Sequence, residues 1–287
     1  MNNKMFKKSL CPVISIDNYS NRILSPKIFE NEGTFYLYFS KSLVNKERKP
    51  NNTYVYVATS KNTEHWKINN SPIISTSPDY ATHRVMSFDV VKAEKNFIGF
   101  FEGRNQNSIS IFMAVSKNLT NWSVITNPIL FDKHNKFSFR TPFCLKKLNH
   151  YYLYYTRSNA KKSEILLNIY SDSKFKKLLK TQIVLKQSNI DEEYMIYAPN
   201  IIKISGKYHM FYSGWSSDPV KGKIFHAVSS DGIIFEKSVG SVLEPDQIHD
   251  KKHCSEPSAI IINNKINIYY EACDNNGNWQ IMLAREI

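Results

Sequence analysis

The chain has 287 residues, with a hydrophobic content of 42% and an aromatic content of 13%. This composition is sufficient for a large core and excludes a chain that is disordered throughout. The formal net charge is +13, but the lysines are scattered over turns and strand faces, so we do not expect nucleic-acid binding. No run of 18 apolar residues occurs, and we therefore expect no membrane span.

The N-terminal segment and the cysteines bear on location and metal binding. The segment MNNKMFKKSLCPVISIDNYS is too polar after its lysines to be a signal peptide, so we expect a cytoplasmic protein. The four cysteines include no CxxC pair, and no His–His–carboxylate spacing occurs, so we predict neither a metal site nor another cofactor. Cys11 and Cys144 stand in apolar runs and are expected in the core.

Five similar segments follow one another along the chain. Each is an apolar strand, a short polar turn and an aromatic strand. They are RILSPKIFENEGTFYLYFS (22–40), MSFDVVKAEKNFIGFFEG (86–103), SFRTPFCLKKLNHYYLYYT (138–156), IYAPNIIKISGKYHMFYSG (196–214) and CSEPSAIIINNKINIYYEA (254–272). A repeat of this size indicates that each segment is part of one structural unit.

A second repeat follows each hairpin and supplies two further strands. It is clearest in VYVATSKNTEHWKINNSPII (55–74), IFMAVSKNLTNWSVITNPIL (111–130) and IFHAVSSDGIIFEKSVGSVL (224–243), and weaker in LLNIYSDSKFKKLLKTQIVL (166–185). Trp66 and Trp122 in these turns are expected to pack between the strands.

The fifth segment has a third strand, WQIMLARE (279–286), but no fourth strand after it. The N-terminal MFKKSLCPVIS (5–15) resembles the missing strand. We therefore predict an all-β fold: a five-bladed β-propeller of four-stranded antiparallel blades, a single domain over residues 1–287. Residues 5–16 would complete the last blade and close the ring, which removes exposed sheet edges.

Several motifs resemble those of the five-bladed propeller glycosidases, such as glycoside hydrolase families 32, 43, 68 and 130. They are FRTP (139–142), YAPN (197–200), SEP (255–257) and the turn SSDGIIF (229–235). In that group, short motifs at the starts of the inner strands place acidic residues in a central funnel. The resemblance implies a carbohydrate-active enzyme with Glu256 as its general acid. The sequence departs from the group at Ser25, Thr141 and Asn200, where acids are usual.

Three carboxylates are the predicted catalytic residues. Asp89 is taken as the counterpart of Glu256 in the second segment, and paired carboxylates suit glycoside chemistry as acid and base or nucleophile. Glu102 and Glu271 end the second strands of equivalent segments, where they could hold sugar hydroxyls or one could be catalytic. Hydrogen bonding of backbone amides at a strand end is the alternative role for Asp89 and Glu256.

The predicted substrate-binding residues lie near the same strand ends. They are Arg22, His83, Arg84, Arg140, Glu193, Tyr197, Asn200, Trp215, His253 and Glu271. Arginine makes planar two-point contacts with carboxylate or phosphate groups, so several arginines around one funnel would fit an anionic sugar. Ion pairing with the funnel carboxylates is the other interpretation.

Three functions remain open from the sequence. The first is a glycoside hydrolase-like enzyme that acts on a glycan or sugar conjugate inside the cell, with surface-polysaccharide metabolism as the expected context. The second is a transferase or other enzyme for a nucleotide-sugar or anionic sugar. The third is a sugar-binding propeller without catalysis, which the missing acids favour.

Overall fold

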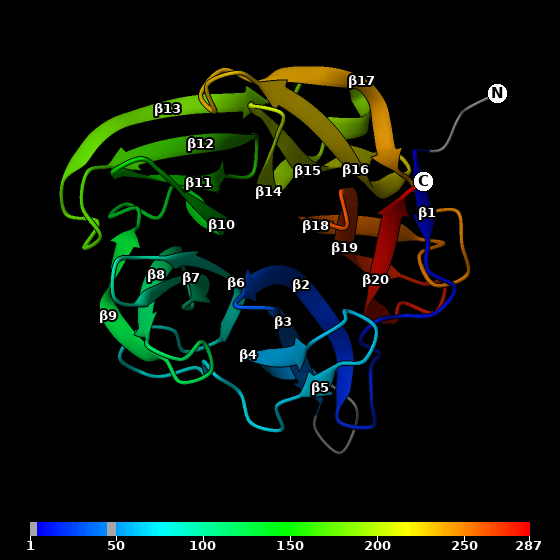
Figure 1. Ribbon diagram of the computed structural model, residues 1–287, viewed down its shortest axis with the longest axis horizontal. Helices are drawn as coiled ribbons and strands as arrows, with labels where there is room; N and C mark the ends of the chain where they lie inside the picture. The colour runs from blue at the N-terminus through cyan, green and yellow to red at the C-terminus, as the bar shows by residue number, and fades with distance from the viewer. Residues whose placement is uncertain (1–4, 45–49) are drawn as a thin grey trace.

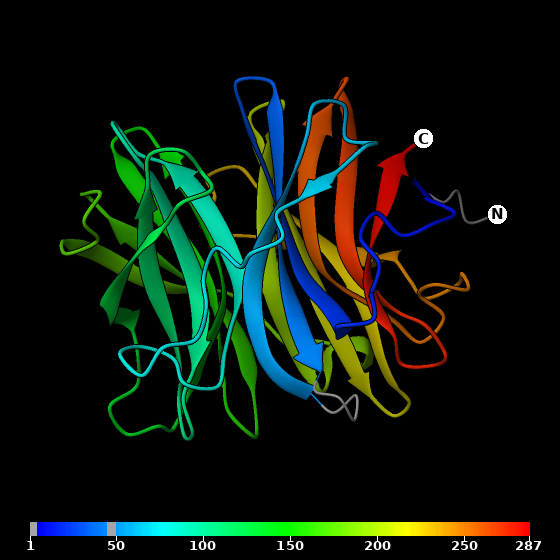
Figure 2. The ribbon, with the colours of Figure 1, turned by 90° about the horizontal axis from the view of Figure 1, so that it is seen from below.

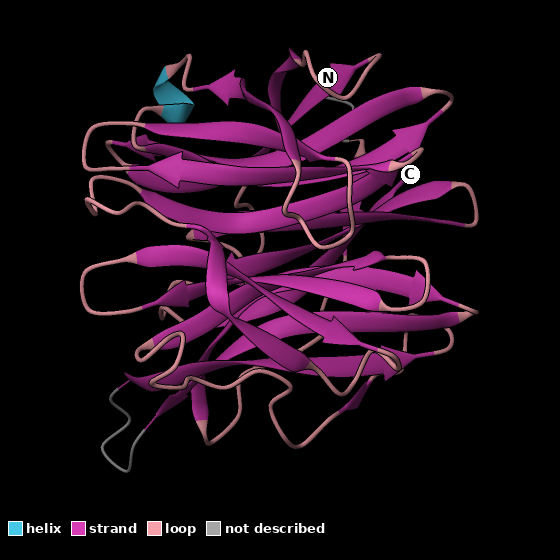
Figure 3. Cartoon of the chain, turned by 90° about the vertical axis from the view of Figure 1, so that its left-hand side faces the viewer, coloured by secondary structure: helices cyan, strands magenta, loops and turns pink. Residues whose placement is uncertain are grey.

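The computed structural model describes residues 5–44 and 50–287. The regular secondary structure of the described chain is almost entirely β-strand, and its one helical segment is the 3-10 turn η1 (Ile190–Glu192), as Figure 3 shows. The predicted all-β class is confirmed. The described part of the chain contains no helix with the length and hydrophobicity to cross a bilayer.

The strands form five groups of antiparallel neighbours, called here units I to V. Unit I consists of β2 (Ser20–Asn31), β3 (Thr34–Val44), β4 (Pro50–Ser60) and β5 (Lys67–Ile68). Unit II consists of β6 (Arg84–Lys92), β7 (Phe97–Arg104), β8 (Ile109–Ser116) and β9 (Ser123–Leu130). Unit III consists of β10 (Ser138–Lys147), β11 (His150–Ser158), β12 (Ser163–Tyr170) and β13 (Leu178–Lys186).

Units IV and V complete the chain. Unit IV consists of β14 (Met195–Ile204), β15 (Lys207–Ser217), β16 (Val220–Ser229) and β17 (Glu236–Leu243). Unit V consists of β18 (His253–Ile262), β19 (Lys265–Cys273), β20 (Trp279–Glu286) and β1 (Phe6–Lys8). The predicted contribution of the N-terminal segment to the last unit is present, because β1 pairs antiparallel with β20 and Ile14 bridges to Ile281.

The units are arranged about a common centre, with the first strand of each unit nearest to it (Figure 1). The N- and C-terminal segments lie close together, beside unit V (Figure 2). Single parallel residue pairs, Arg22 with Trp279 and Thr53 with Arg84, join units V, I and II into one 12-stranded sheet. Among the described residues, units III and IV are separate four-stranded sheets.

Buried apolar clusters fill the space between neighbouring units. Each of the five clusters draws side chains from two consecutive units, and the cluster around Tyr269 and Ile23 joins unit V to unit I. Trp66 and Trp122 pack in this way, with their indole N–H groups donating to Thr63 O and Leu119 O. The core is therefore divided among the junctions between units, and the centre is left to polar side chains.

The prediction for the cysteines is half correct. Cys144 is buried in the cluster between units II and III, but Cys11 is exposed. The chain bends after Ser9 and is bonded to unit V again at Val13, whose N–H donates to Ile281 O at 2.7 Å, so Cys11 lies in a surface bend and not in a strand.

Candidate active site

The first strand of every unit carries the same backbone irregularity near its start. One residue there has a φ angle in the left-handed region, and one extra residue shifts the strand pairing around it. The five residues are Ser25 (53°), Ser87 (55°), Thr141 (46°), Ala198 (55°) and Glu256 (45°). A side chain costs roughly 1–2 kcal/mol in this region, so recurrence at five equivalent positions indicates that the central geometry requires it.

This register corrects the predicted position of Asp89. The left-handed residue of unit II is Ser87, and Asp89 lies two residues further along β6. The prediction was wrong because Phe88 stands where the other four units have a proline directly after the left-handed residue. The sequence of unit II therefore lacks the marker that aligns the other units.

Asp89 and Asn200 occupy equivalent positions and make equivalent contacts. Asp89 Oδ2 accepts a hydrogen bond from the backbone N–H of Cys144 at 2.7 Å, and Asn200 Oδ1 accepts one from Ala259 N–H at 2.8 Å. Both bonds cross from one unit to the next. The structure thus gives both residues the role of joining units by hydrogen bonds to the backbone.

The second strands supply a ring of polar residues opposite the strand starts. They are Ser40, Glu102, Thr156, Ser213 and Glu271, which share one register position. Four of them accept a hydrogen bond from the backbone N–H of the left-handed residue in the next unit. In unit II the carboxylate of Glu102 accepts a hydrogen bond from Arg84 Nη2 at 3.1 Å.

A cavity of about 230 Å³ opens at the strand starts of units II to V. Its lining is Arg84, Met86, Glu102, Arg140, Thr141, Tyr194, Met195, Tyr197, Trp215 and Glu256. Six of these residues were predicted as site residues from the sequence, namely Arg84, Glu102, Arg140, Tyr197, Trp215 and Glu256. All predicted site residues lie in the described chain, and those outside this lining are Arg22, His83, Asp89, Glu193, Asn200, His253 and Glu271.

Four lining residues were not predicted as site residues, and one of them, Thr141, was noted in the sequence only as a departure from the resembled group. Met86 directly precedes the left-handed Ser87, as Tyr197 precedes Ala198, so a correct alignment of unit II would have found it. Tyr194 and Met195 follow η1, and Tyr194 is 58% exposed at the rim. Nothing in their local pattern distinguishes them from other loop residues.

Glu256 is the most strongly perturbed carboxyl group in this lining. Its side chain is buried, and Ser87 Oγ donates a weak hydrogen bond to Oε2 at 3.4 Å. Burial raises its pKa well above the ordinary value, and the nearby Glu271 adds to this, whereas Ser25 and the Lys27 ammonium act in the opposite direction. A raised pKa favours the protonated form of the carboxyl group, which is the form that a general acid needs.

Glu271 lies behind Glu256 and is more strongly held. Ser255 Oγ donates to Glu271 Oε1 at 2.6 Å, and Ser25 N–H donates to Oε2 at 3.1 Å. Burial raises the pKa of Glu271, while these two bonds and Tyr197 lower it. Both of its oxygens thus accept hydrogen bonds from the protein, and its charge helps to raise the pKa of Glu256.

Lys27 and Asp89 are two buried titratable groups that interact electrostatically, and both lie outside the cavity lining. The Lys27 side chain is 2% exposed, and its Nζ has no hydrogen-bond partner among the described residues. Burial raises the pKa of Asp89 to about 7 against the lowering effects of Lys27 and of the Cys144 and Val90 backbone bonds. Burial lowers the pKa of Lys27, whereas the nearby Asp89 and Glu256 act to raise it.

We expect Asp89→Asn to remove a pH dependence from the stability of the fold. Between the ordinary carboxyl pKa of 3.8 and about 7 the folded state binds more protons than the unfolded state, so the free energy of unfolding should fall as pH rises through this window and level off above it. Asparagine keeps an oxygen acceptor for Cys144 N–H. Urea unfolding of both proteins at several pH values from 4 to 8 measures the effect, and parallel curves would contradict it.

Aromatic rings form one wall of the cavity. The rings of Trp215 and His253 lie 4.6 Å apart, and the His253 ring stacks on Trp279 at 5.7 Å. Burial, with Lys252 and Lys221 nearby, lowers the pKa of His253 to about 4, so the ring is neutral near pH 7. His253 therefore packs against Trp215 as a neutral ring, and Trp215 itself lines the cavity.

The other predicted residues lie on the surface around the cavity. Arg22 and His83 are exposed, and His83 Nδ1 contacts Thr82 Oγ1 at 2.8 Å. Glu193 is exposed and accepts a hydrogen bond from Ser217 Oγ. No cluster of His, Cys, Asp or Glu in the described chain has the geometry of a metal site.

The family of the chain follows from a comparison with protein-family models. The model described as the glycosyl hydrolases family 32 N-terminal domain matches residues 26–206 and 198–285. The chain therefore belongs to this family and is a glycosidase-like enzyme. No curated protein sequence matches it significantly.

Solved structures resemble the whole chain at low sequence identity. A glycoside hydrolase aligns with a TM-score of 0.80 and 13% identity over 97% of this chain and 92% of the other. The β-1,2-mannobiose phosphorylase of Listeria innocua aligns with a TM-score of 0.79 and 12% identity, over 99% and 96%. The GH32 β-fructofuranosidase of Bombyx mori gives 0.71 and 17%, over 96% and 62%. These likenesses show the fold.

Proposed function

We propose that the chain is a glycoside hydrolase-like enzyme with Glu256 as its general acid. One observation carries the proposal: Glu256 is a buried carboxyl group with a raised pKa, and it lines the cavity at the strand starts. Such an acid can donate its proton to the oxygen of a glycosidic bond as that bond breaks.

Glu102 is the second carboxylate of the proposed reaction. It lines the same cavity, and its carboxylate accepts a hydrogen bond from Arg84 Nη2. Asp89 had this role in the prediction from sequence. Its carboxylate instead bonds to the backbone of the next unit, outside the cavity lining, so we transfer the role to Glu102.

The fold proposal is a single domain in the form of a closed five-bladed propeller. Side chain-to-backbone hydrogen bonds join each unit to the next, including unit V to unit I through Ser258 Oγ and Ile28 N–H at 2.9 Å. Pairing of β1 with β20 gives unit V its fourth strand. A closed ring would hold Glu102 and Glu256, which come from units II and V, at a fixed separation.

Hydrolysis of a panel of aryl glycosides tests the proposed activity. Release of the phenol from at least one sugar is expected, and proton NMR of the first product formed would show whether the anomeric configuration is retained or inverted. A panel without turnover on any sugar, together with binding of the intact glycosides, would favour the sugar-binding alternative. The transferase alternative, action inside the cell and a role in surface-polysaccharide metabolism stay predictions.

A further inference from the structure

The cavity wall formed by units II and III has more positive than negative charge. Arg84 and Arg140 line the cavity, and Arg104 is close enough for both to lower its pKa, after the larger effect of burial. Glu102 is the carboxylate that faces this group, and it forms its ion pair with Arg84. Of these three guanidinium groups, only that of Arg84 forms an ion pair within the described chain.

Arg140 is the least compensated of the three. Its side chain is half-buried, and in the described chain it makes no ion pair and its Nε is a buried donor without a partner. The Nε of Arg84 is also buried and unpartnered. Partly buried cations without an acceptor are costly, so this arrangement is readily explained if an anion completes it.

The aromatic residues of the cavity indicate which kind of ligand would carry this anionic group. Tyr197 and Trp215 line the cavity as flat aromatic walls, with Tyr194 at the rim, and such rings stack on the apolar face of a sugar. Glu256 lines the same cavity. A sugar bound there would therefore lie against aromatic rings, in a cavity that also presents the proposed acid and the two arginines.

We propose that the cavity binds a sugar that carries an anionic group, a carboxylate or a phosphate, and that Arg84 and Arg140 hold that group. A guanidinium presents parallel N–H donors that match the oxygens of either group. This inference rests on the proposed function, because it takes the cavity to be the substrate site. It excludes neutral sugars as the preferred substrates.

Binding by the Glu256→Gln variant tests the proposal without turnover. Isothermal titration would compare galacturonic acid with galactose and glucose 6-phosphate with glucose, with inorganic phosphate alone as a further probe. At least one anionic sugar should bind tenfold or more tightly than its neutral partner, and added salt should reduce the difference. The pair with the larger difference in affinity shows whether the site prefers a carboxylate or a phosphate group.

Further substitutions in the Glu256→Gln variant test whether Arg140 causes the preference for anionic sugars. Arg140→Met should abolish the preference, and Arg140→Lys should retain part of it because the charge remains. Arg22→Met is the matched control, since Arg22 fits the same sequence pattern but lies outside the cavity, and it should change nothing. Melting temperatures within a few degrees of the parent would establish folding.

Three results would overturn the proposal. They are equal binding within each pair, no binding of either anionic sugar at millimolar concentration, and a preference that survives Arg140→Met. Failure of the glycosidase proposal is a separate outcome: anionic sugars would bind through Arg140, but no glycoside would be hydrolysed.

Discussion

Replacing Glu256 with glutamine is expected to lower kcat by a factor of about 10²–10⁴ on glycosides with a basic leaving group. Glutamine has nearly the same shape as the protonated acid, but it cannot give a proton to the glycosidic oxygen. Binding should therefore survive. Steady-state kinetics with alkyl and aryl glycosides of the same sugar measures the change.

The leaving group and the pH profile separate a lost acid from a general disturbance. A dinitrophenyl leaving group departs without protonation, so Glu256→Gln should lose far less activity on that substrate. Activity of the parent protein should fall as pH rises through the raised pKa of Glu256, and this alkaline limb should be absent from the variant. Glu193→Gln, at an exposed acid outside the cavity, is the control. Equal losses on both substrate classes would show that Glu256 is not the acid.

The repeated arrangement of strands could be predicted because the same pattern of strands and turns occurs five times in the sequence. Each unit alternates apolar strands with polar turns, and the turns at Ser60, Ser116 and Ser229 close through the same bond, in which the serine Oγ accepts from a backbone N–H three residues later. The contribution of β1 to unit V followed from the same count, because the last segment lacked one strand.

The site was harder to predict because the bulges decide which side chains face the cavity. The proline after Ser25, Thr141, Ala198 and Glu256 marks the left-handed residue, and there the register was correct. In unit II this proline is missing, and the predicted alignment was displaced by two residues. It placed Asp89, which bonds to the backbone of unit III, at the position that Ser87 occupies. No local pattern separates Arg84 from Arg22, because each stands three residues before the left-handed residue of its unit and only the arrangement of the units places Arg84 on the cavity. Arg140 directly precedes Thr141, as Tyr197 precedes Ala198.

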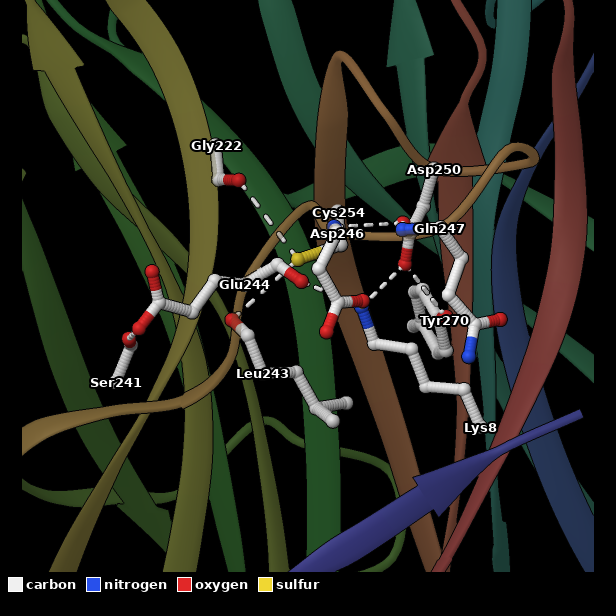
Figure 4. A network of polar contacts seen from close by, with 10 residues as sticks. All are labelled: Lys8, Gly222, Ser241, Leu243, Glu244, Asp246, Gln247, Asp250, Cys254 and Tyr270. Atoms are coloured by element: carbon white, nitrogen blue, oxygen red, sulfur yellow. Dashed lines mark hydrogen bonds and ion pairs between the residues drawn. The ribbon is translucent and has the colours of Figure 1, made fainter. Parts of the chain in front are cut away.

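The second large effect is expected at the N-terminal strand, from Lys8→Met. The ammonium of Lys8 is buried and lies 2.5 Å from Asp250 Oδ2 and 2.7 Å from Asp246 Oδ1, and it also donates to Glu244 O (Figure 4). The Asp250 side chain is fully buried, and Tyr270 donates to the same oxygen at 2.9 Å. Lys8 thus joins β1 to the chain before β18.

Lys8→Met should lower the free energy of unfolding by about 3–5 kcal/mol, because it leaves a buried carboxylate without its cation. Lys7→Met is the matched control, since Lys7 is the exposed neighbour in the same strand, and it should change stability by less than about 0.5 kcal/mol. Adding Asp250→Asn to Lys8→Met should restore part of the loss, because no unpaired charge remains. Urea unfolding of the four proteins measures these differences. If Lys8→Met were no more harmful than Lys7→Met, the pairing of β1 with unit V would contribute little to the stability of the fold.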